Sequence, residues 1–186
     1  MIKTIKANLI IFFTVIGAVA VGLIFLRYGF SWETLLVMAV SAILLAVAYI
    51  DFRTSEIPDI LNIALVPLSV LAIWIQPDVS LLSRGVGFFA VSLPMLLLAL
   101  VISGAFGGGD IKLMAVCGFL LGWQNTVLAF FIALLLGGSY AIHLMLTRKR
   151  ERDQHMVFGP ALCAGVFVAL LYGNTIISWY IGLLGF

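Results

Sequence analysis

Charged residues are scarce in this chain of 186 residues, which carries only 10 Lys or Arg and 8 Asp or Glu. Hydrophobic residues make up 64% of it, and the mean hydropathy is +1.25. A soluble domain of this length needs far more charge on its surface. The scarcity therefore excludes an ordinary soluble enzyme, and we expect no nucleic-acid partner. We expect an integral membrane protein with one domain, residues 1–186.

Metal-binding patterns are also missing. The two cysteines, Cys117 and Cys163, both fall in apolar segments, and no CxxC pair exists, which excludes a zinc knuckle or a redox motif. His143 and His155 lie apart, with no partner cysteines and no His-Glu pair of helical spacing. We expect no metal and no cofactor, and we interpret both cysteines as small core residues.

Long apolar runs dominate what remains, and they predict an all-α polytopic transmembrane bundle of about seven spans. The first run follows "MIKTIK" like a signal peptide, but it continues through Leu26, so we expect a retained first helix. The fifth run is short, and the tail 175–186 is too short to cross. The runs cover approximately residues 7–26, 33–50, 57–75, 85–103, 111–123, 126–146 and 157–172.

The positive charges predict an orientation, because Lys and Arg concentrate in cytosolic loops. If the N-terminus is cytosolic and the spans alternate, only Arg27 and Arg84 fall outside. Eight basic residues then fall inside: Lys3, Lys6, Arg53, Lys112, Arg148, Lys149, Arg150 and Arg152. The sequence therefore predicts a cytosolic N-terminus and a cytosolic loop at 147–155.

Two aspartates fall at the predicted cytosolic boundary, where Asp51 ends the second span and Asp110 begins the fifth. A helical hairpin separates them, and an antiparallel bundle can bring them together. Two such carboxylates form a dyad that shares one proton, in which the ionised acid activates water and the protonated acid polarises a carbonyl. Gly107 and Gly109 lack a Cβ and would admit an extended substrate backbone. Each residue also has a structural interpretation: Asp110 as a helix N-cap, Asp51 as an ordinary boundary residue, and the glycines as a hinge.

Three segments resemble, in the same order, the sequence blocks of type IV prepilin peptidases, which are bacterial GxGD aspartyl proteases. "DFRTSEIPDILN", residues 51–62, is similar to the first catalytic block, and "GGGDIKLMAVCGFLLGW", residues 107–123, to the second. "FGPALCAG", residues 158–165, resembles the third, non-catalytic block. The resemblance covers residues 33–172 and leaves residues 1–32 as an extra N-terminal span and loop.

Matched residue by residue, the resemblance implies that Asp51 and Asp110 are the catalytic acids. It implies that Gly107 and Gly109 are the loop glycines of the motif. Lys112 matches the motif lysine, and three roles remain open for it: an anchor to lipid phosphate, a charge that tunes the dyad, or a topology determinant.

The remaining matches have weaker implications. Pro58 fits a helix start, where its missing N–H is tolerated. Gly159 and Pro160 either contribute to the substrate site or simply open the seventh span. Val157 departs from the family pattern, which often has Pro before an aromatic-Gly pair.

The resemblance implies a hydrolase, a membrane-embedded aspartic endopeptidase that removes the short basic leader of type IV prepilins or pseudopilins. Its partners would be the substrate and the lipid bilayer, and its active site would face the cytosol from the bacterial inner membrane. Larger members carry a cytosolic CxxC domain that goes with N-methylation, whereas "RYGFSWE" alone joins the first two spans here. We therefore expect the short form, similar to the peptidases of tight-adherence pili, without N-methyltransferase activity.

Three alternatives remain. A presenilin-like protease shares the chemistry but usually has Tyr directly before the first Asp, where this chain has Ile50. A small transporter or channel would place its acids near the middle of the membrane and favour internal repeats. A non-enzymatic pilus-assembly scaffold would need no working dyad.

Overall fold

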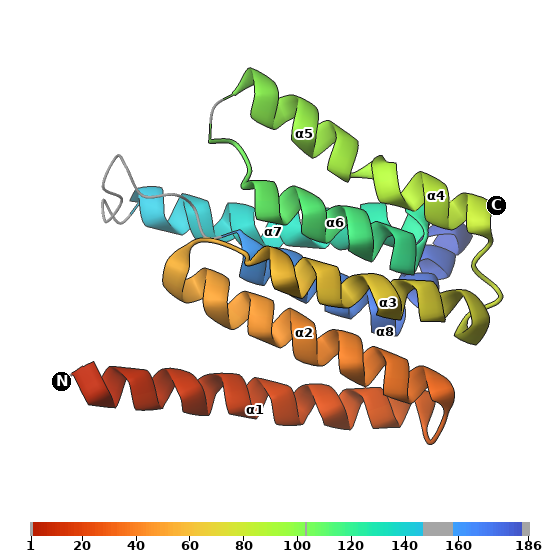
Figure 1. Cartoon of the computed structure of the whole chain (residues 1–186), viewed down its shortest axis with the longest axis horizontal. Helices are drawn as coiled ribbons and strands as arrows, with labels where there is room; N and C mark the ends of the chain where they lie inside the picture. The colour runs from red at the N-terminus through yellow and green to blue at the C-terminus, as the bar shows by residue number, and fades with distance from the viewer. Residues whose placement is uncertain (1, 103, 147–157, 184–186) are drawn as a thin grey trace.

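The computed structural model describes residues 2–102, 104–146 and 158–183, which form helices and no strand (Figure 1). The all-α prediction is confirmed, whereas the predicted loop at 147–155 lies outside the described residues. The eight helices are α1 (Ile2–Tyr28), α2 (Trp32–Thr54), α3 (Asp59–Ile75), α4 (Leu81–Ala90), α5 (Ser92–Val101), α6 (Gly108–Leu121), α7 (Trp123–Leu146) and α8 (Gly159–Leu183).

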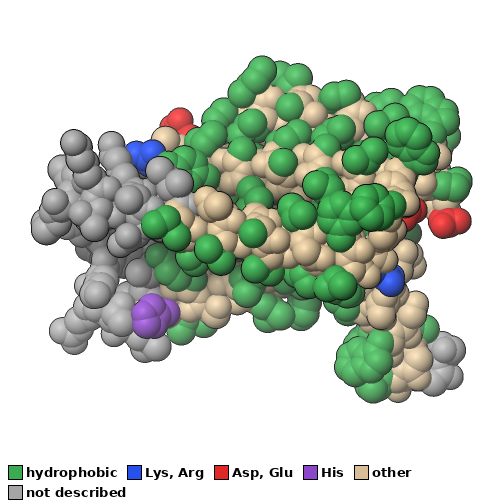
Figure 2. Space-filling model, turned by 90° about the horizontal axis from the view of Figure 1, so that it is seen from below, with side chains coloured by type: hydrophobic (Ala, Val, Ile, Leu, Met, Phe, Trp, Pro, Cys, Tyr) green, Lys and Arg blue, Asp and Glu red, His purple; other side chains and the backbone are tan. Residues whose placement is uncertain are grey.

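The helices run back and forth between two ends of the bundle. The start of α1, the α2–α3 connection and the start of α6 lie at one end, which we call the dyad end because it holds Asp51 and Asp110 (Figure 1). Hydrophobic side chains cover the visible side of the molecule, and the visible charged ones lie toward its two ends (Figure 2). This is the distribution that a bilayer requires.

Within the described part of the chain, five segments are long and apolar enough to cross a membrane: Ile11–Tyr28, Trp32–Thr54, Leu81–Val101, Trp123–His143 and Gly159–Leu183. Helix α3 has 17 residues and is apolar but shorter. Helix α6 has only 14 residues, or about 21 Å of helix against a hydrocarbon core of about 30 Å. The chain is a multi-pass membrane protein.

Three predicted boundaries need correction. The span predicted at 85–103 is present as one apolar segment, but it begins earlier, at Leu81, and it consists of two helices, α4 and α5, with a break at Val91. Pro94 explains the break, because proline has no N–H for the carbonyl of Ala90 four residues earlier and its ring clashes with that carbonyl. The tail beginning at residue 175 is not separate, because α8 continues to Leu183. Helix α2 runs three residues past Asp51, to Thr54.

Helix α6 lies in the interior, against α3, α4, α7 and α8. Its Leu113 and Met114 are fully buried, and so is Leu162 of α8. Gly118 of α6 meets Gly87 of α4 so closely that a Cβ on either residue would collide with the carbonyl oxygen of the other. Small residues let membrane helices approach in this way, and the close crossing fixes α6 in the bundle.

Arg84 is the most unusual core residue, because its side chain is completely buried. Its guanidinium donates to backbone carbonyls at the ends of α3 and α6 and between α3 and α4: Ala72, Gln76, Val79, Phe119 and Leu120, at 2.8–3.3 Å. Helix C-termini carry unpaired carbonyls and partial negative charge. Arg84 therefore joins two helix ends, and its side chain is buried in α4 instead of exposed in a loop. Its predicted place on the outer side stays a prediction.

Candidate active site

Asp51 lies in the last turn of α2, and its side chain is only 4% exposed. Its Oδ2 accepts a hydrogen bond of 2.9 Å from the backbone amide of Gly159, the first residue of α8. The N-terminus of a helix presents free N–H groups and partial positive charge to an anion. The start of α8 therefore holds one oxygen of Asp51 in place and favours negative charge on it.

Asp110 lies in the first turn of α6 and is 8% exposed. Its Oδ2 accepts from the amide of Gly107 at 3.3 Å. Gly107, and not Asp110, is the N-cap of α6, so the N-cap interpretation of Asp110 was wrong. Its Oδ1 is buried and has no hydrogen-bond partner among the described residues. A buried carboxyl oxygen without a partner is available to a proton, a water or a substrate.

The fold brings the two acids together at the dyad end, where the charge of Asp51 acts on Asp110. Each acid has one oxygen fixed by a backbone amide, from Gly159 for Asp51 and from Gly107 for Asp110. Two neighbouring carboxylates disfavour double ionisation, and such pairs titrate together. The arrangement can supply one general base and one general acid.

The glycines before Asp110 differ from one another. A Cβ on Gly109 would lie 2.7 Å from the Cβ of Ile57 and 3.0 Å from its carbonyl oxygen. A Cβ on Gly107 would lie 3.2 Å from Asp110 Oδ2, whereas one on Gly108 would meet no heavy atom within 4 Å. The close approach that requires glycine at 109 is thus to the chain's own α2–α3 connection. The substrate approach that the sequence suggested for Gly107 and Gly109 stays a prediction beside this structural reason.

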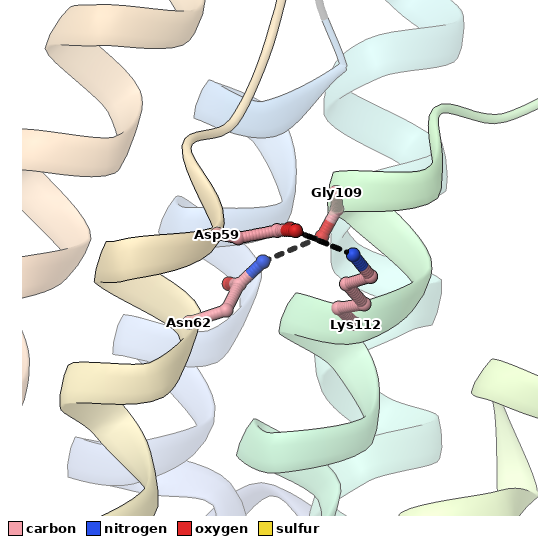
Figure 3. A network of polar contacts seen from close by, with 4 residues as sticks. All are labelled: Asp59, Asn62, Gly109 and Lys112. Carbon is pink, nitrogen blue, oxygen red and sulfur yellow. Dashed lines mark hydrogen bonds and ion pairs between the residues drawn. The ribbon is translucent and has the colours of Figure 1, made fainter.

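Two polar contacts join the start of α3 to the start of α6 (Figure 3). Lys112 Nζ lies 2.7 and 2.8 Å from the two carboxylate oxygens of Asp59, in an exposed ion pair. Asn62 is buried, and its Nδ2 donates to the carbonyl oxygen of Gly109 at 3.2 Å. Lys112 therefore points toward Asp59, and Asn62 holds the peptide unit that directly precedes Asp110.

Sequence reasoning did not single out Asn62 or Asp59 as site residues. The available signal for Asn62 was a polar side chain near the start of an apolar span, where such residues need a partner. Of the weaker candidates, Pro58 is the residue immediately before α3. Gly159 contacts Asp51 directly, and Pro160 is the next residue of α8.

Cys117 and Cys163 are free and buried, as expected of core residues. Within the part of the chain that the structure describes, no three His, Cys, Asp or Glu side chains are grouped as a metal site needs. That the protein works without a metal or cofactor stays a prediction.

Comparison with known proteins places these residues in a family context. Residues 38–142 match the model of the type IV leader peptidase family. The matched region contains both aspartates, all of α3 to α6 and most of α2 and α7. It leaves out α1 and α8, and therefore Gly159.

Curated relatives carry the name prepilin leader peptidase/N-methyltransferase. The chain is 36% identical to the one from Bacillus subtilis over 156 residues, which cover 84% of this chain and 63% of that protein. Identity is 29% to the one from Legionella pneumophila, covering 84% and 56%, and 28% to the one from Pseudomonas aeruginosa, covering 86% and 57%. The chain thus spans less than two thirds of the length of these relatives. No solved structure matches it.

Proposed function

We propose, since this chain belongs to the type IV leader peptidase family, that it is an aspartic endopeptidase of the bacterial inner membrane that cleaves the leader from prepilins or pseudopilins. One observation carries the proposal. Two buried carboxylates, Asp51 and Asp110, lie at one end of the bundle, each with one oxygen fixed by a backbone amide. The substrate class comes from the family and from the names of the relatives, and the acids supply the chemistry.

The chemistry follows from a dyad that holds one proton. The ionised carboxylate takes a proton from water as the water oxygen bonds to the carbonyl carbon of the scissile peptide. The protonated carboxyl gives its proton to the carbonyl oxygen, and a tetrahedral intermediate forms. The C–N bond then breaks as the proton taken from water passes to the leaving nitrogen, and the hydroxyl proton returns to the other carboxylate. The dyad ends in its starting state, so no other reactant is consumed.

The dyad end faces the cytosol in this proposal. Arg53 and Lys112 belong to that end, together with the basic N-terminal segment of the sequence. At the opposite end, Arg84 is buried, which leaves Arg27 as the basic side chain exposed there among the described residues. Basic residues favour the cytosolic side, so the described basic residues support a cytosolic dyad end.

Incubation of the purified protein with candidate prepilins, followed by mass mapping of the new N-terminus, tests the activity. We expect one cut in the leader region by the wild type, and cleavage slower by about 10²–10⁴-fold by Asp51→Asn or Asp110→Asn at equal protein levels. Glu56→Gln serves as a control, because Glu56 is an exposed acid close to Asp51 in sequence. Cleavage by Asp110→Asn at the wild-type rate would remove the dyad from the mechanism.

Single cysteines test the orientation, after Cys117 and Cys163 have been replaced. An impermeant thiol reagent applied to intact cells should label Asp78→Cys, in the connection before α4, and not Glu56→Cys at the dyad end. Both positions are exposed. The reverse pattern would place the site on the outer face.

A further inference from the structure

A groove with a volume of about 490 Å³ lies between α1, α2 and α8. Its lining is apolar apart from one hydroxyl, with Phe12 and Ile16 on α1, Leu45 on α2 and Ala164 and Phe167 on α8. We call it the α1 groove. A flat surface of side chains would be enough to contact lipid, so a hollow of this size between three helices needs a separate explanation.

The α1 groove begins beside the candidate dyad. Phe52 and Pro160 both line it. Phe52 directly follows Asp51 in the sequence, and Pro160 directly follows Gly159, the residue whose amide donates to Asp51. A chain lying in the groove would therefore pass next to Asp51.

The one hydroxyl in the groove belongs to Ser41. Ser41 lies eleven positions before Phe52 on α2, so it sits about 16 Å along the helix from the groove's mouth. It is 5% exposed, and its Oγ has no hydrogen-bond partner among the described residues. Burial of a hydroxyl without a hydrogen-bond partner is unfavourable. This position therefore indicates an occupant that supplies a polar group deep in the membrane.

Helix α1 is hydrogen-bonded to α8 at the end far from the dyad. There Tyr28 donates its hydroxyl to the carbonyl of Leu170 at 2.6 Å, and Arg27 donates to that of Leu171 at 3.1 Å. Nearer the dyad, Phe13 of α1 packs its ring on Tyr49 of α2 at 5.3 Å between centroids. Helix α1 thus contacts α8 beyond the groove and α2 beside it, and between these contacts it forms the outer wall.

We propose that the α1 groove receives the apolar membrane helix of the substrate, starting directly after the cleaved bond. This inference rests on the proposed peptidase function. The distance from Phe52 to Ser41 corresponds to about three helical turns, so the groove takes the side chains along one face of the first eleven or so residues. A helix can bring a polar side chain to Ser41, whereas a lipid acyl chain has no hydrogen-bonding group at that depth. This difference favours the substrate helix over lipid.

Photo-cross-linking tests the occupant directly. In the full-length Asp110→Asn protein, p-benzoylphenylalanine replaces Phe12 or Phe167 of the groove in membranes that contain prepilin. Phe89 on α4 and Phe131 on α7 are controls outside the groove, and their exposures of 58% and 56% match the 59% of Phe12. We expect adducts from Phe12 and Phe167 on the apolar segment of prepilin, within about eleven residues of the cut. Equal adducts from all four positions, or adducts with lipid alone, would overturn the proposal.

A groove-filling variant separates docking from chemistry. Ala164→Trp places an indole in the groove, and Ala141→Trp places one on a half-buried alanine of α7 outside it. Two substrates are compared: membrane-embedded prepilin, and a soluble peptide that spans the cut and ends a few residues after it. The readout is the KM for prepilin divided by the KM for the peptide. We expect this ratio to rise about tenfold in Ala164→Trp, because the variant loses binding energy for prepilin only. In Ala141→Trp the ratio should stay unchanged. An unchanged ratio in Ala164→Trp, with cleavage by the wild type intact, would refute the docking site alone. Failure of the wild type to cleave either substrate would refute the proposed function.

Discussion

The backbone amide of Gly159 donates to the carboxylate of Asp51 at 2.9 Å, across 108 positions of the sequence. The contact joins the first residue of α8 to the last turn of α2. It explains why residues 158–165, which resemble a non-catalytic block of the family, lie at the candidate site. It also leaves no room for a side chain at 159. A Cβ there would lie 2.5 Å from Asp51 Oδ2 and 2.7 Å from its Cγ.

Gly159→Ala should therefore displace the Asp51 carboxylate. We expect kcat for prepilin to fall about a hundredfold, because a misplacement of about 1 Å can have that effect on a catalytic group. Gly182→Ala on the same helix is the control, since a Cβ there meets no heavy atom within 4 Å. Initial rates at saturating substrate measure the effect, and equal activity of the two variants would show that Asp51 has room to adjust.

The glycines before Asp110 allow a matched comparison of neighbours. Gly109→Ala would press a Cβ against the Cβ and carbonyl of Ile57, whereas Gly108→Ala meets open space. We expect Gly109→Ala to lose activity by at least tenfold and to lower the melting temperature, because the α2–α3 connection and α6 must separate. Gly108→Ala should stay close to wild type in both. Cleavage rates and thermal unfolding in detergent give the two readouts, and a harmless Gly109→Ala would contradict the close approach.

Sequence reasoning identified both acids because carboxylates stand out in a chain with 10% charged residues and because they fall at the edges of apolar runs. It could not identify the amide of Gly159, since a backbone donor has no sequence signal of its own. It could not predict that Arg84 is buried, because an exposed arginine and a buried one look the same in sequence until α3 and α6 are packed together. It predicted the apolar span at 85–103 but not the break at Val91 within it, because mean hydropathy does not report the effect of Pro94 on the helix.

Asn62 should position the loop that carries Asp110. Its amide nitrogen donates to the carbonyl of Gly109 at 3.2 Å, and a hydrogen bond of this kind contributes about 1 kcal/mol. Asn62→Leu keeps a similar volume but removes the donor, and we expect kcat to fall roughly tenfold with little change in KM. Asn62→Gln should recover less than half of the loss, because its longer side chain moves the donor.

Ser69→Ala is the matched control for Asn62→Leu. Ser69 is a buried polar residue of the same helix, but its hydroxyl bonds within α3 to the carbonyl of Val66. Ser69→Ala should lower the stability of the protein slightly and leave kcat almost unchanged. If both variants reduced kcat in proportion to their loss of stability, Asn62 would have a structural role only.

The two aspartates should behave as one unit. Asp51→Asn and Asp110→Asn keep the shape of each side chain, but each leaves the site with a single carboxyl group. We expect each to reduce cleavage by about 10²–10⁴-fold, the usual contribution of general acid–base catalysis. Because losses within a unit are not additive, the double variant should be hardly slower than either single one. If the double variant instead lost activity by the product of the two single losses, the two aspartates would have independent roles.

Arg84 should be a determinant of stability. Its guanidinium donates to five backbone carbonyls from a fully buried position. Lysine keeps the charge but carries its three donors on a single nitrogen. It therefore cannot reach all of the carbonyls that the planar guanidinium reaches with three separate nitrogens. Arg84→Lys should leave some carbonyls unpaired and lower the free energy of unfolding in detergent by about 2–4 kcal/mol, since each buried unpaired group costs about 1–3 kcal/mol. Arg27→Lys, at an exposed arginine of the same end of the bundle, should change it by less than about 1 kcal/mol. Equal melting temperatures for the two variants would show that the ends of α3 and α6 do not depend on the arginine that joins them.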